Sequence, residues 1–194
     1  MYNFFAMLSR MKYINRWALM RNAREENLSE HSLEVAAIAH ALTVMQNELE
    51  GTRLNAERAA LMGIYHDMPE IITGDMPTPV KHGNPELQAA YKAVENDAAG
   101  TILSMLPEYM RESYLCCFAP RPEDRELQRL VKAADKISAL IKCVEEEQAG
   151  NREFLGAKQA TLAAVREMDI AAADRFVDEF LQSYSLNLDE LLKN

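Results

Sequence analysis

The sequence has little glycine, proline or cysteine, and it lacks the alternation of polar and apolar residues that would indicate β-strands. Seven glycines and seven prolines in 194 residues leave no room for long linkers or low-complexity tracts. The three cysteines, Cys116, Cys117 and Cys143, form no C-x-x-C pair, and adjacent cysteines rarely bridge each other. An odd set without a disulfide framework is typical of a reducing cytoplasm. We therefore expect a cytoplasmic protein in which all three cysteines are structural.

Long apolar runs are also missing. No stretch approaches the roughly 18 apolar residues of a membrane span, and Arg10, Lys12 and Arg16 interrupt any candidate signal peptide. The formal net charge of −9 argues against binding to long nucleic acid or to an anionic membrane. Residues 1–24 nevertheless carry +5, and the remainder carries −14. Because apolar and aromatic residues continue through this basic segment, we expect it to be part of the domain.

Helical periodicity dominates what is present. With 48% hydrophobic and 26% charged residues, the chain fits one domain, residues 1–194, with a well-buried core. Asn27, with Glu30 three residues later, resembles a capping box before the apolar run at 33–45. Further helices are expected at about 55–66, 85–106, 107–117, 126–148, 152–167 and 170–183, with a proline-rich loop at 73–79. The sequence thus predicts an all-α, compact single-domain bundle.

The most informative motif is the pair His66-Asp67 at the end of an apolar helical segment. Neighbouring side chains on a helix lie about 100° apart, so both can reach one ion. His31 opens another apolar helix 35 residues before His66, and Asp135 lies 68 residues after Asp67 in the middle of a third. An acid on the apolar face around Asp135 would be costly to bury without a partner.

Two imidazoles and two carboxylates suit a divalent cation such as Co²⁺, Mn²⁺, Zn²⁺ or Fe²⁺, with Mg²⁺ also open. Such an ion lowers the pKa of a bound water and neutralises charge on a phosphoryl group. The four residues together therefore indicate hydrolysis of a phosphate ester.

Glu70 follows the His-Asp pair by three residues, so a continuing helix would place it one turn along on the same face. There a carboxylate could exchange a proton with the leaving oxygen or the attacking water. Pro69 disturbs a helix at this turn, and a surface glutamate is the alternative. The other two histidines lack such a setting, and we interpret His40 as a residue of the apolar helix and His82 as a loop residue.

The order His, His-Asp, Asp on three helices resembles the HD-domain phosphohydrolase superfamily. Longer motifs resemble the bacterial HD-domain 5′-deoxynucleotidase family, at residues 9–10, 14–22, 29–33, 65–70, 73–81 and 146–154. The similarity runs over nearly the whole chain and is densest in residues 5–81. One small departure is Met68-Pro69 within the core motif, where smaller residues are common.

The resemblance implies a metal-dependent homodimer that hydrolyses deoxyribonucleoside 5′-monophosphates to deoxynucleoside and phosphate. Arg16 would orient the phosphate, which suits its planar guanidinium, Trp17 would form a wall against the sugar, and Glu70 would assist proton transfer. The ion would be held by His31, His66, Asp67 and Asp135, of which the two aspartates would also contact the substrate. The deoxyribose would be contacted by Asp75, Met76, Pro77 and Thr78.

Three other classes of protein share part of this pattern. An HD hydrolase acting on a dNTP or on guanosine tetraphosphate is disfavoured by the missing long insertions and by the Pro-Thr-Pro loop. A non-catalytic HD module that binds a nucleotide usually loses a ligand, whereas all four are present here together with Glu70 and Arg16. HD-like diiron oxygenases need more His and Asp ligands than this pattern supplies.

Overall fold

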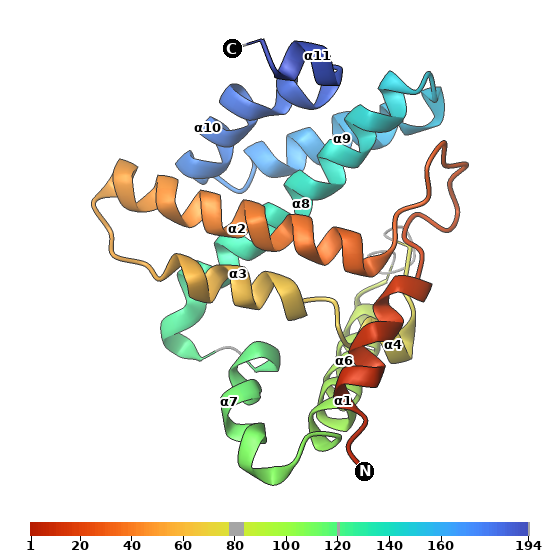
Figure 1. Cartoon of the computed structure of the whole chain (residues 1–194), viewed down its shortest axis with the longest axis vertical. Helices are drawn as coiled ribbons and strands as arrows, with labels where there is room; N and C mark the ends of the chain where they lie inside the picture. The colour runs from red at the N-terminus through yellow and green to blue at the C-terminus, as the bar shows by residue number, and fades with distance from the viewer. Residues whose placement is uncertain (78–83, 120, 194) are drawn as a thin grey trace.

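The computed structural model describes residues 1–77, 84–119 and 121–193, in which every regular element is a helix (Figure 1). The predicted all-α fold is therefore confirmed. Within these residues, no helix is both long enough and apolar enough to cross a membrane. The helices are, in chain order, α1 (Phe4–Leu8), η1 (Ser9–Tyr13), α2 (Leu28–Glu50), α3 (Ala56–Tyr65), α4 (Glu70–Thr73), α6 (Pro85–Ser104), α7 (Glu108–Phe118), η2 (Pro122–Asp124), α8 (Arg125–Gln148), η3 (Arg152–Phe154), α9 (Leu155–Arg166), α10 (Ala171–Phe180), η4 (Leu181–Ser185) and α11 (Leu188–Leu191).

Side-chain caps and glycine set the ends of the long helices. The Asn27 side chain accepts hydrogen bonds from the first backbone N–H groups of α2, and the Asn55 side chain does the same for α3. Gly150 follows α8 with a φ of +82°, and the N–H of Asn151 donates to the carbonyl of Glu146 at 2.9 Å. This is a Schellman motif, which requires a left-handed residue that glycine adopts without strain.

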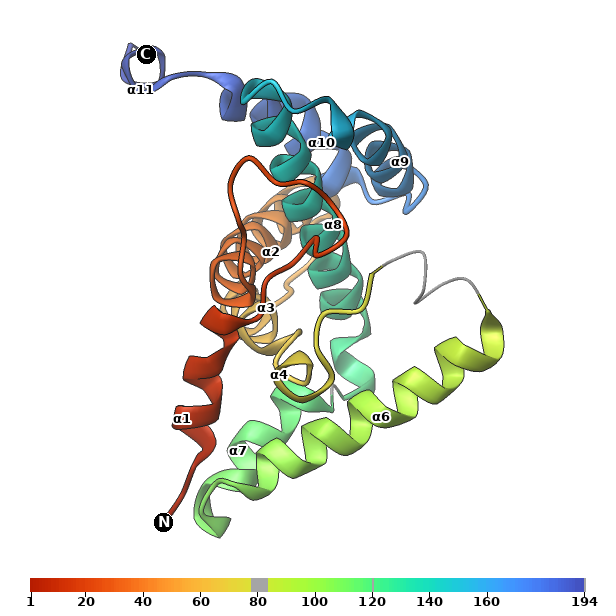
Figure 2. The ribbon, with the colours of Figure 1, turned by 90° about the vertical axis from the view of Figure 1, so that its right-hand side faces the viewer.

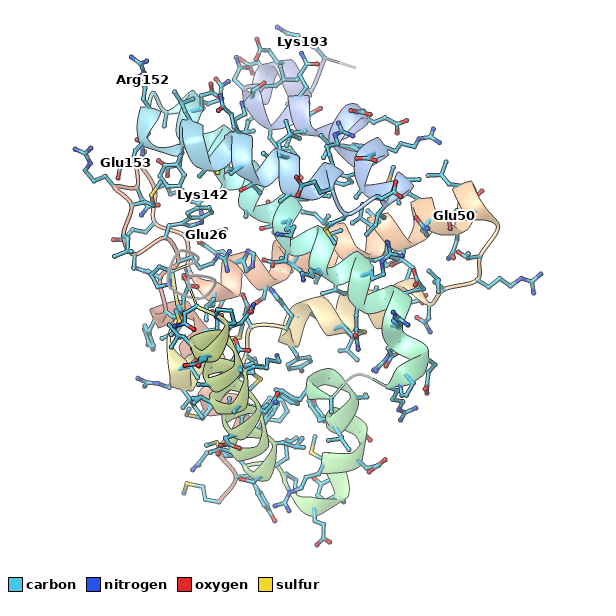
Figure 3. All side chains as sticks on the ribbon, turned by 180° about the vertical axis from the view of Figure 1, so that it is seen from behind. Glu26, Glu50, Lys142, Arg152, Glu153 and Lys193 are labelled. Atoms are coloured by element: carbon cyan, nitrogen blue, oxygen red, sulfur yellow. The ribbon has the colours of Figure 1, made fainter. Side chains whose placement is uncertain are left out.

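The elements form three tiers along the long axis of the molecule (Figure 1). Helices α2, α3 and α8 pack against one another in the middle tier. The C-terminal helices α9 to α11 form one end, and α1, α4, α6 and α7 form the other. The loop of residues 14–27 runs from η1 to α2 and passes beside α8 (Figure 2). Figure 3 shows Glu26, Lys142 and Glu153 gathered on that side of the molecule.

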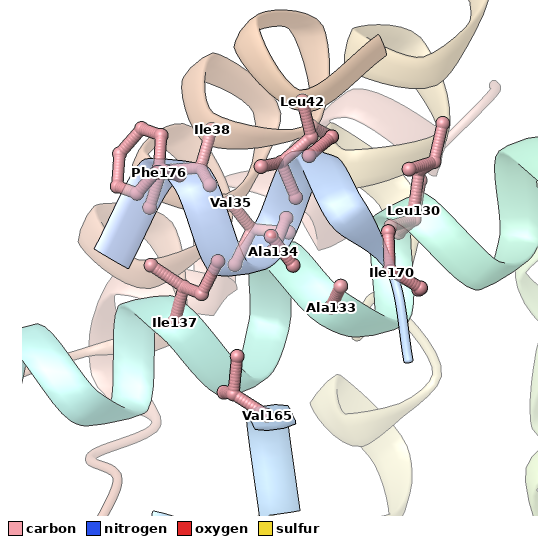
Figure 4. Close-up of a cluster of buried hydrophobic side chains, with 14 of the residues drawn as sticks. Val35, Ile38, Leu42, Leu130, Ala133, Ala134, Ile137, Val165, Ile170 and Phe176 are labelled. Carbon is pink, nitrogen blue, oxygen red and sulfur yellow. The ribbon is translucent and has the colours of Figure 1, made fainter. Parts of the chain in front are cut away.

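The main hydrophobic core lies between the middle tier and the C-terminal helices (Figure 4). Burial of apolar side chains is the main favourable contribution to such packing. Helices α2 and α3 approach very closely at Gly63, where a Cβ atom would lie 2.7 Å from Ala36 Cα. The core is built around the buried residues Val35, Ile38, Leu42, Leu130, Ala133, Ala134, Ile137, Val165, Ile170 and Phe176.

A second apolar cluster joins the turn after α3 to the opposite end of the molecule. Met68 is completely buried in it, beside Tyr65 and Phe4. The departure from smaller residues at Met68-Pro69 thus has a structural role, since Met68 fills a core and Pro69 precedes α4. The turn that carries His66 and Asp67 is held by apolar packing on its far side.

Candidate metal centre

Three elements bring the four predicted ligands together. His31 lies in the first turn of α2, His66 and Asp67 lie in the turn after α3, and Asp135 lies on α8. The Nε2 atom of His31 is 3.5 Å from Asp67 Oδ2 and 3.2 Å from Asp135 Oδ1. The Nε2 atom of His66 is 3.1 Å from Asp67 Oδ2 and 4.0 Å from Asp135 Oδ1. Ligand atoms of His31, His66 and Asp67 all lie within 4.8 Å of one another, so these three residues could hold a metal ion.

Hydrogen bonds on the far side of each imidazole fix which nitrogen faces the centre. His66 Nδ1 lies 2.7 Å from the carbonyl oxygen of Gly63, so Nδ1 carries the proton and donates it. His31 Nδ1 lies 3.0 Å from Ser138 Oγ, which itself donates to Glu34 Oε2 at 2.6 Å. Because the single hydroxyl proton of Ser138 is committed to Glu34, its oxygen accepts from His31 Nδ1. Burial raises the pKa of Glu34 to about 7, so this acceptor is fully charged only above neutral pH.

The chemistry of the donor set therefore fits a divalent cation. The Nε2 atoms of both histidines are buried and make no hydrogen bond within the described residues. With Nδ1 bonded on the far side of each ring, Nε2 is the nitrogen that faces the centre, and a bound cation would take the place of its proton, because imidazole binds metals through an unprotonated nitrogen. Nitrogen and oxygen donors in this combination suit a borderline ion rather than Ca²⁺, which takes oxygen ligands.

The carboxylates give the centre a negative charge. Burial alone would lower the pKa of His66, but the charges of Asp67 and Asp135 raise it to about 9. Burial conversely favours the neutral form of Asp67, yet the neighbouring His66, His31 and Arg16 hold the pKa of Asp67 well below its usual range. Despite burial, the contact with His31 lowers the pKa of Asp135 to about 2. Both acids are thus charged at neutral pH and attract a cation.

Asp135 is the most exposed of the four carboxylate and imidazole groups at the centre. Its side chain is 39% exposed, whereas that of His31 is fully buried and that of Asp67 is 17% exposed. The partner that such an acid requires is present, because His31 Nε2 lies 3.2 Å from Asp135 Oδ1, and the carboxylate is still partly exposed. A carboxylate in that position can meet both an ion and a ligand that approaches from solvent.

Arg16 and Trp17 lie next to the centre and share one acidic partner. Arg16 Nη1 donates to Asp67 Oδ2 at 3.2 Å, and its Nε donates to Glu26 Oε2 at 3.3 Å. The indole N–H of Trp17 donates to the same Glu26 oxygen at 3.0 Å. Burial would lower the pKa of Arg16, but the surrounding carboxylates, including Asp75, raise it. Sequence reasoning missed Glu26, because an acid after a basic segment resembles an ordinary solvated residue.

Glu70 begins α4 instead of continuing α3. The chain turns at residues 66–69, with Pro69 at the N-cap of α4, so the continuous helix considered from the spacing is not formed. Glu70 is only 4% exposed, so it is not a surface residue. Asp75 lies close enough to Arg16 to affect its pKa, and Met76 and Pro77 are half-buried. Thr78 lies outside the described residues, as does His82.

The remaining candidates lie outside the centre. His40 is exposed on α2. The three cysteines are free, and burial raises the pKa of Cys117 and of Cys143 to about 11. Cys116 is half-buried, and its sulfur accepts a hydrogen bond from Arg58. A thiol whose pKa is raised stays protonated and is poorly reactive, which supports structural roles for Cys117 and Cys143.

An all-helical fold with a His, His-Asp, Asp centre defines an HD-domain phosphohydrolase. An HD-domain phosphohydrolase from Listeria innocua superimposes with a TM-score of 0.78 at 25% identity, covering 94% of this chain and 88% of its own. A cyanophage S-2L HD phosphohydrolase, DatZ, solved with dA and one catalytic Zn²⁺ ion, shares the fold with a TM-score of 0.64 at 19% identity, covering 92% and 95% of the two chains.

Sequence comparison gives the family. The sequence model of the YfbR-like 5′-deoxynucleotidase family matches residues 3–184, so the chain belongs to this family. It is 48% identical to the 5′-deoxynucleotidase YfbR of Shigella dysenteriae, over 97% of this chain and 95% of the relative. It is 46% identical to a 5′-deoxynucleotidase of Yersinia pestis, over 98% and 97% of the two chains. The predicted family is confirmed, and with it the class of phosphoric monoester hydrolases.

Proposed function

We propose that the chain hydrolyses deoxyribonucleoside 5′-monophosphates to deoxynucleoside and phosphate, with a divalent cation held by His31, His66, Asp67 and Asp135. The observation that carries this proposal is the pair of buried Nε2 atoms that have no hydrogen-bond partner among the described residues and that face two charged carboxylates. The cyanophage HD phosphohydrolase holds one catalytic Zn²⁺ and dA, which fits an ion beside a deoxynucleoside. When bound, a divalent cation polarises water for attack and offsets phosphate charge.

The protein's own side chains bind and orient the substrate in this proposal. Arg16 turns its guanidinium from the Asp67 carboxylate to the phosphate oxygens, which match its planar donors. Trp17 covers the sugar, and Asp75 accepts a hydrogen bond from the 3′-hydroxyl. Asp75 is joined in the sugar contacts by Met76, Pro77 and Thr78. Glu70 supplies a buried carboxyl that transfers a proton at the leaving 5′-oxygen or at the attacking water.

A phosphate-release screen tests the proposal directly. Purified protein is offered dNMPs, rNMPs, dNTPs and guanosine tetraphosphate, first after chelation and then with Co²⁺, Mn²⁺, Zn²⁺, Fe²⁺ or Mg²⁺ added back. We expect activity on dNMPs alone, lost on chelation and restored by an added ion. His66→Ala and Asp135→Ala should each abolish turnover with the helical content retained, because each removes one of four ligands. Turnover near that of the wild type in either variant at limiting metal would reject the ligand assignment.

We further propose a cytoplasmic homodimer. Free cysteines and a nucleotide substrate favour the cytoplasm. Several large apolar side chains are strongly exposed and offer adaptable surface for a second copy, among them Leu19, Leu33, Tyr109, Leu188 and Leu192. Light scattering should give a particle of about twice 22.0 kDa. A particle of single-chain mass at micromolar concentration would contradict the dimer.

A further inference from the structure

One family motif, residues 146–154, contains none of the proposed ligands or substrate contacts. We propose that it is a positioning element, in which Glu146 and Asn151 hold the loop of residues 14–27 and Phe154 holds Trp17. The loop then presents Arg16 and Trp17 to the metal centre. This inference rests on the proposed function only in taking Arg16 and Trp17 as substrate contacts.

The base of the loop is closed by its own backbone. Arg16 N–H donates to the Glu26 carbonyl at 2.9 Å, and Leu28 N–H donates to the Ile14 carbonyl at 3.0 Å. Asn15 and Asn27 form an isolated antiparallel bridge between the two arms. These bonds bring Glu26 back beside Arg16 and Trp17, but they leave residues 18–25 without a partner strand. Within the loop, the Asn22 side chain donates to the carbonyls of Trp17 and Met20, and further contacts to the tip come from α8.

Glu146 on α8 supplies those contacts through a buried carboxylate that is 1% exposed. Its two oxygens accept from the backbone N–H groups of Ala23, at 2.7 Å, and of Arg24, at 3.2 Å. They also accept from Lys142 Nζ and, at 2.7 Å, from Asn151 Nδ2. All four partners are donors, so the site needs a group that only accepts, which is an ionised carboxylate.

Neighbouring residues extend the same attachment. Lys142 Nζ also donates to the Arg24 carbonyl, and Asn151 Nδ2 also donates to the Arg21 carbonyl at 2.6 Å. Arg21 in turn donates through Nε to Glu153 at 2.5 Å. The loop tip is therefore bonded to α8 and to the motif of residues 146–154 mainly through its backbone groups, and Arg21 adds one side-chain contact. Backbone attachment fixes the conformation of the loop independently of most of its side chains.

Trp17 occupies a conformation that needs this support. Its φ is +58°, in the left-handed region, which is a strained conformation for a bulky L residue. The Trp17 carbonyl accepts from Met20 N–H at 2.8 Å, and the indole packs against Phe154 with 5.3 Å between ring centroids. Phe154 is fully buried. Because surrounding structure must over-determine such a conformer, release of the loop tip should release Trp17 as well.

Trp17 is the single tryptophan of the chain, so its fluorescence reports the loop without substrate or metal. We would compare Glu146→Gln and Asn151→Ala with the matched control Glu147→Gln. Glu147 is the next residue of α8, and its carboxylate accepts from Lys158 instead of from the loop. Glutamine at 146 places an amide NH₂ against backbone N–H donors, which leaves buried donors without acceptors.

We expect stronger acrylamide quenching and a red-shifted emission in metal-free Glu146→Gln and Asn151→Ala, and wild-type values in Glu147→Gln. The KM for dAMP should rise about tenfold in the first two variants, because apparent affinity falls with the fraction of the competent conformer. Binding of Co²⁺, followed by titration, should stay within about twofold, since the ligands are untouched. Wild-type quenching in both folded variants, or changed quenching with unchanged KM, would overturn the proposal.

Two further variants keep the outcomes distinct. If Glu146→Gln loses its helical circular dichroism, Asn151→Ala and Phe154→Leu decide the matter by the same quenching and KM measurements. Arg16→Ala tests the underlying function separately. If its KM is unchanged, Arg16 is not a phosphate contact. The proposed role of Arg16 is then rejected, independently of the quenching results for the loop.

Discussion

Gly63 has two roles: it allows α2 and α3 to approach closely, which excludes any larger side chain, and its backbone carbonyl accepts a hydrogen bond from His66. Any Cβ would lie 2.7 Å from Ala36 Cα and 2.9 Å from Ala36 N, both of them backbone atoms, and the carbonyl of Gly63 orients His66. We expect Gly63→Ala to destabilise the fold by about 1–3 kcal/mol, the usual size of overpacking. Urea unfolding measures this change in the free energy of unfolding.

Gly100 on α6 offers a contrasting substitution. It has open space around it, so Gly100→Ala should stabilise the fold by about 0.5–1 kcal/mol in the same measurement.

Glu70 combines burial with a place at the N-terminus of α4, directly after the turn of the ligands. If it transfers a proton, Glu70→Ala should lower turnover by about 10²–10⁴-fold, the usual contribution of general acid–base catalysis. Metal content, measured by elemental analysis, should stay at the wild-type level. Loss of the metal together with activity would make Glu70 a support for the ligands.

Trp17 and Arg16 are adjacent in sequence, but their substitution should change substrate preference in different ways. Every nucleoside monophosphate presents the same phosphate, so Arg16→Ala should weaken all of them alike. Trp17 is the bulky side chain next to Arg16, the proposed phosphate contact. An apolar wall distinguishes a sugar with one extra hydroxyl from a sugar without it by only about 10²-fold. Trp17→Ala should therefore narrow the ratio of kcat/KM for dAMP to that for AMP. An unchanged ratio, with both substrates slowed equally, would make Trp17 a packing residue.

At the scale of elements, the helices that carry the proposed metal ligands could be predicted from the sequence. Asn27 and Asn55 mark the starts of α2 and α3, because their side chains accept hydrogen bonds from the first turn of each helix. Gly150 marks the end of α8, because it adopts the left-handed conformation that lets the chain end the helix. Short elements escaped prediction: α1 and η1 have no side-chain cap, and α11 has only four residues. The stretches expected as 152–167 and 170–183 start or end in 3₁₀ turns, which periodicity alone does not distinguish.

The candidate site divides in the same way. The sequence could predict that His31, His66, Asp67 and Asp135 lie together, because their residue types and spacing are typical of a metal site. The groups that orient His31 were not found, because Ser138 reaches His31 and Glu34 only through the packing of α8 against α2. Their positions in the sequence carry no signal that distinguishes them from ordinary helix residues. Long-range contacts of this kind require the fold.

The attachment of the loop to α8 should make stability depend on pH. Burial would raise the pKa of Glu146, but its hydrogen bonds from Lys142 and the loop lower it from 4.5 to about 2. A carboxyl that is more acidic in the folded state stabilises the fold above its unfolded pKa, and this contribution is lost as the pH falls from about 4.5 to 2. The difference in unfolding free energy between wild type and Glu146→Gln should be full at pH 7 and shrink below pH 4.5. Denaturation at several pH values would measure it, and a constant difference would contradict the ionised state of Glu146.

At the scale of the whole molecule, the centre joins α2, the turn after α3, and α8, which are far apart in the sequence but pack as one tier. An ion bound there would be a cross-link between distant segments of a chain whose three cysteines are all free. Unlike a disulfide, such a link would not restrain the unfolded chain, because the unfolded segments no longer present four converging ligands, so the ion would stabilise the protein by binding to its folded state. The melting temperature should then rise with the logarithm of the free ion concentration. In this protein the supply of metal would set not only how fast the enzyme works but how much of it remains folded.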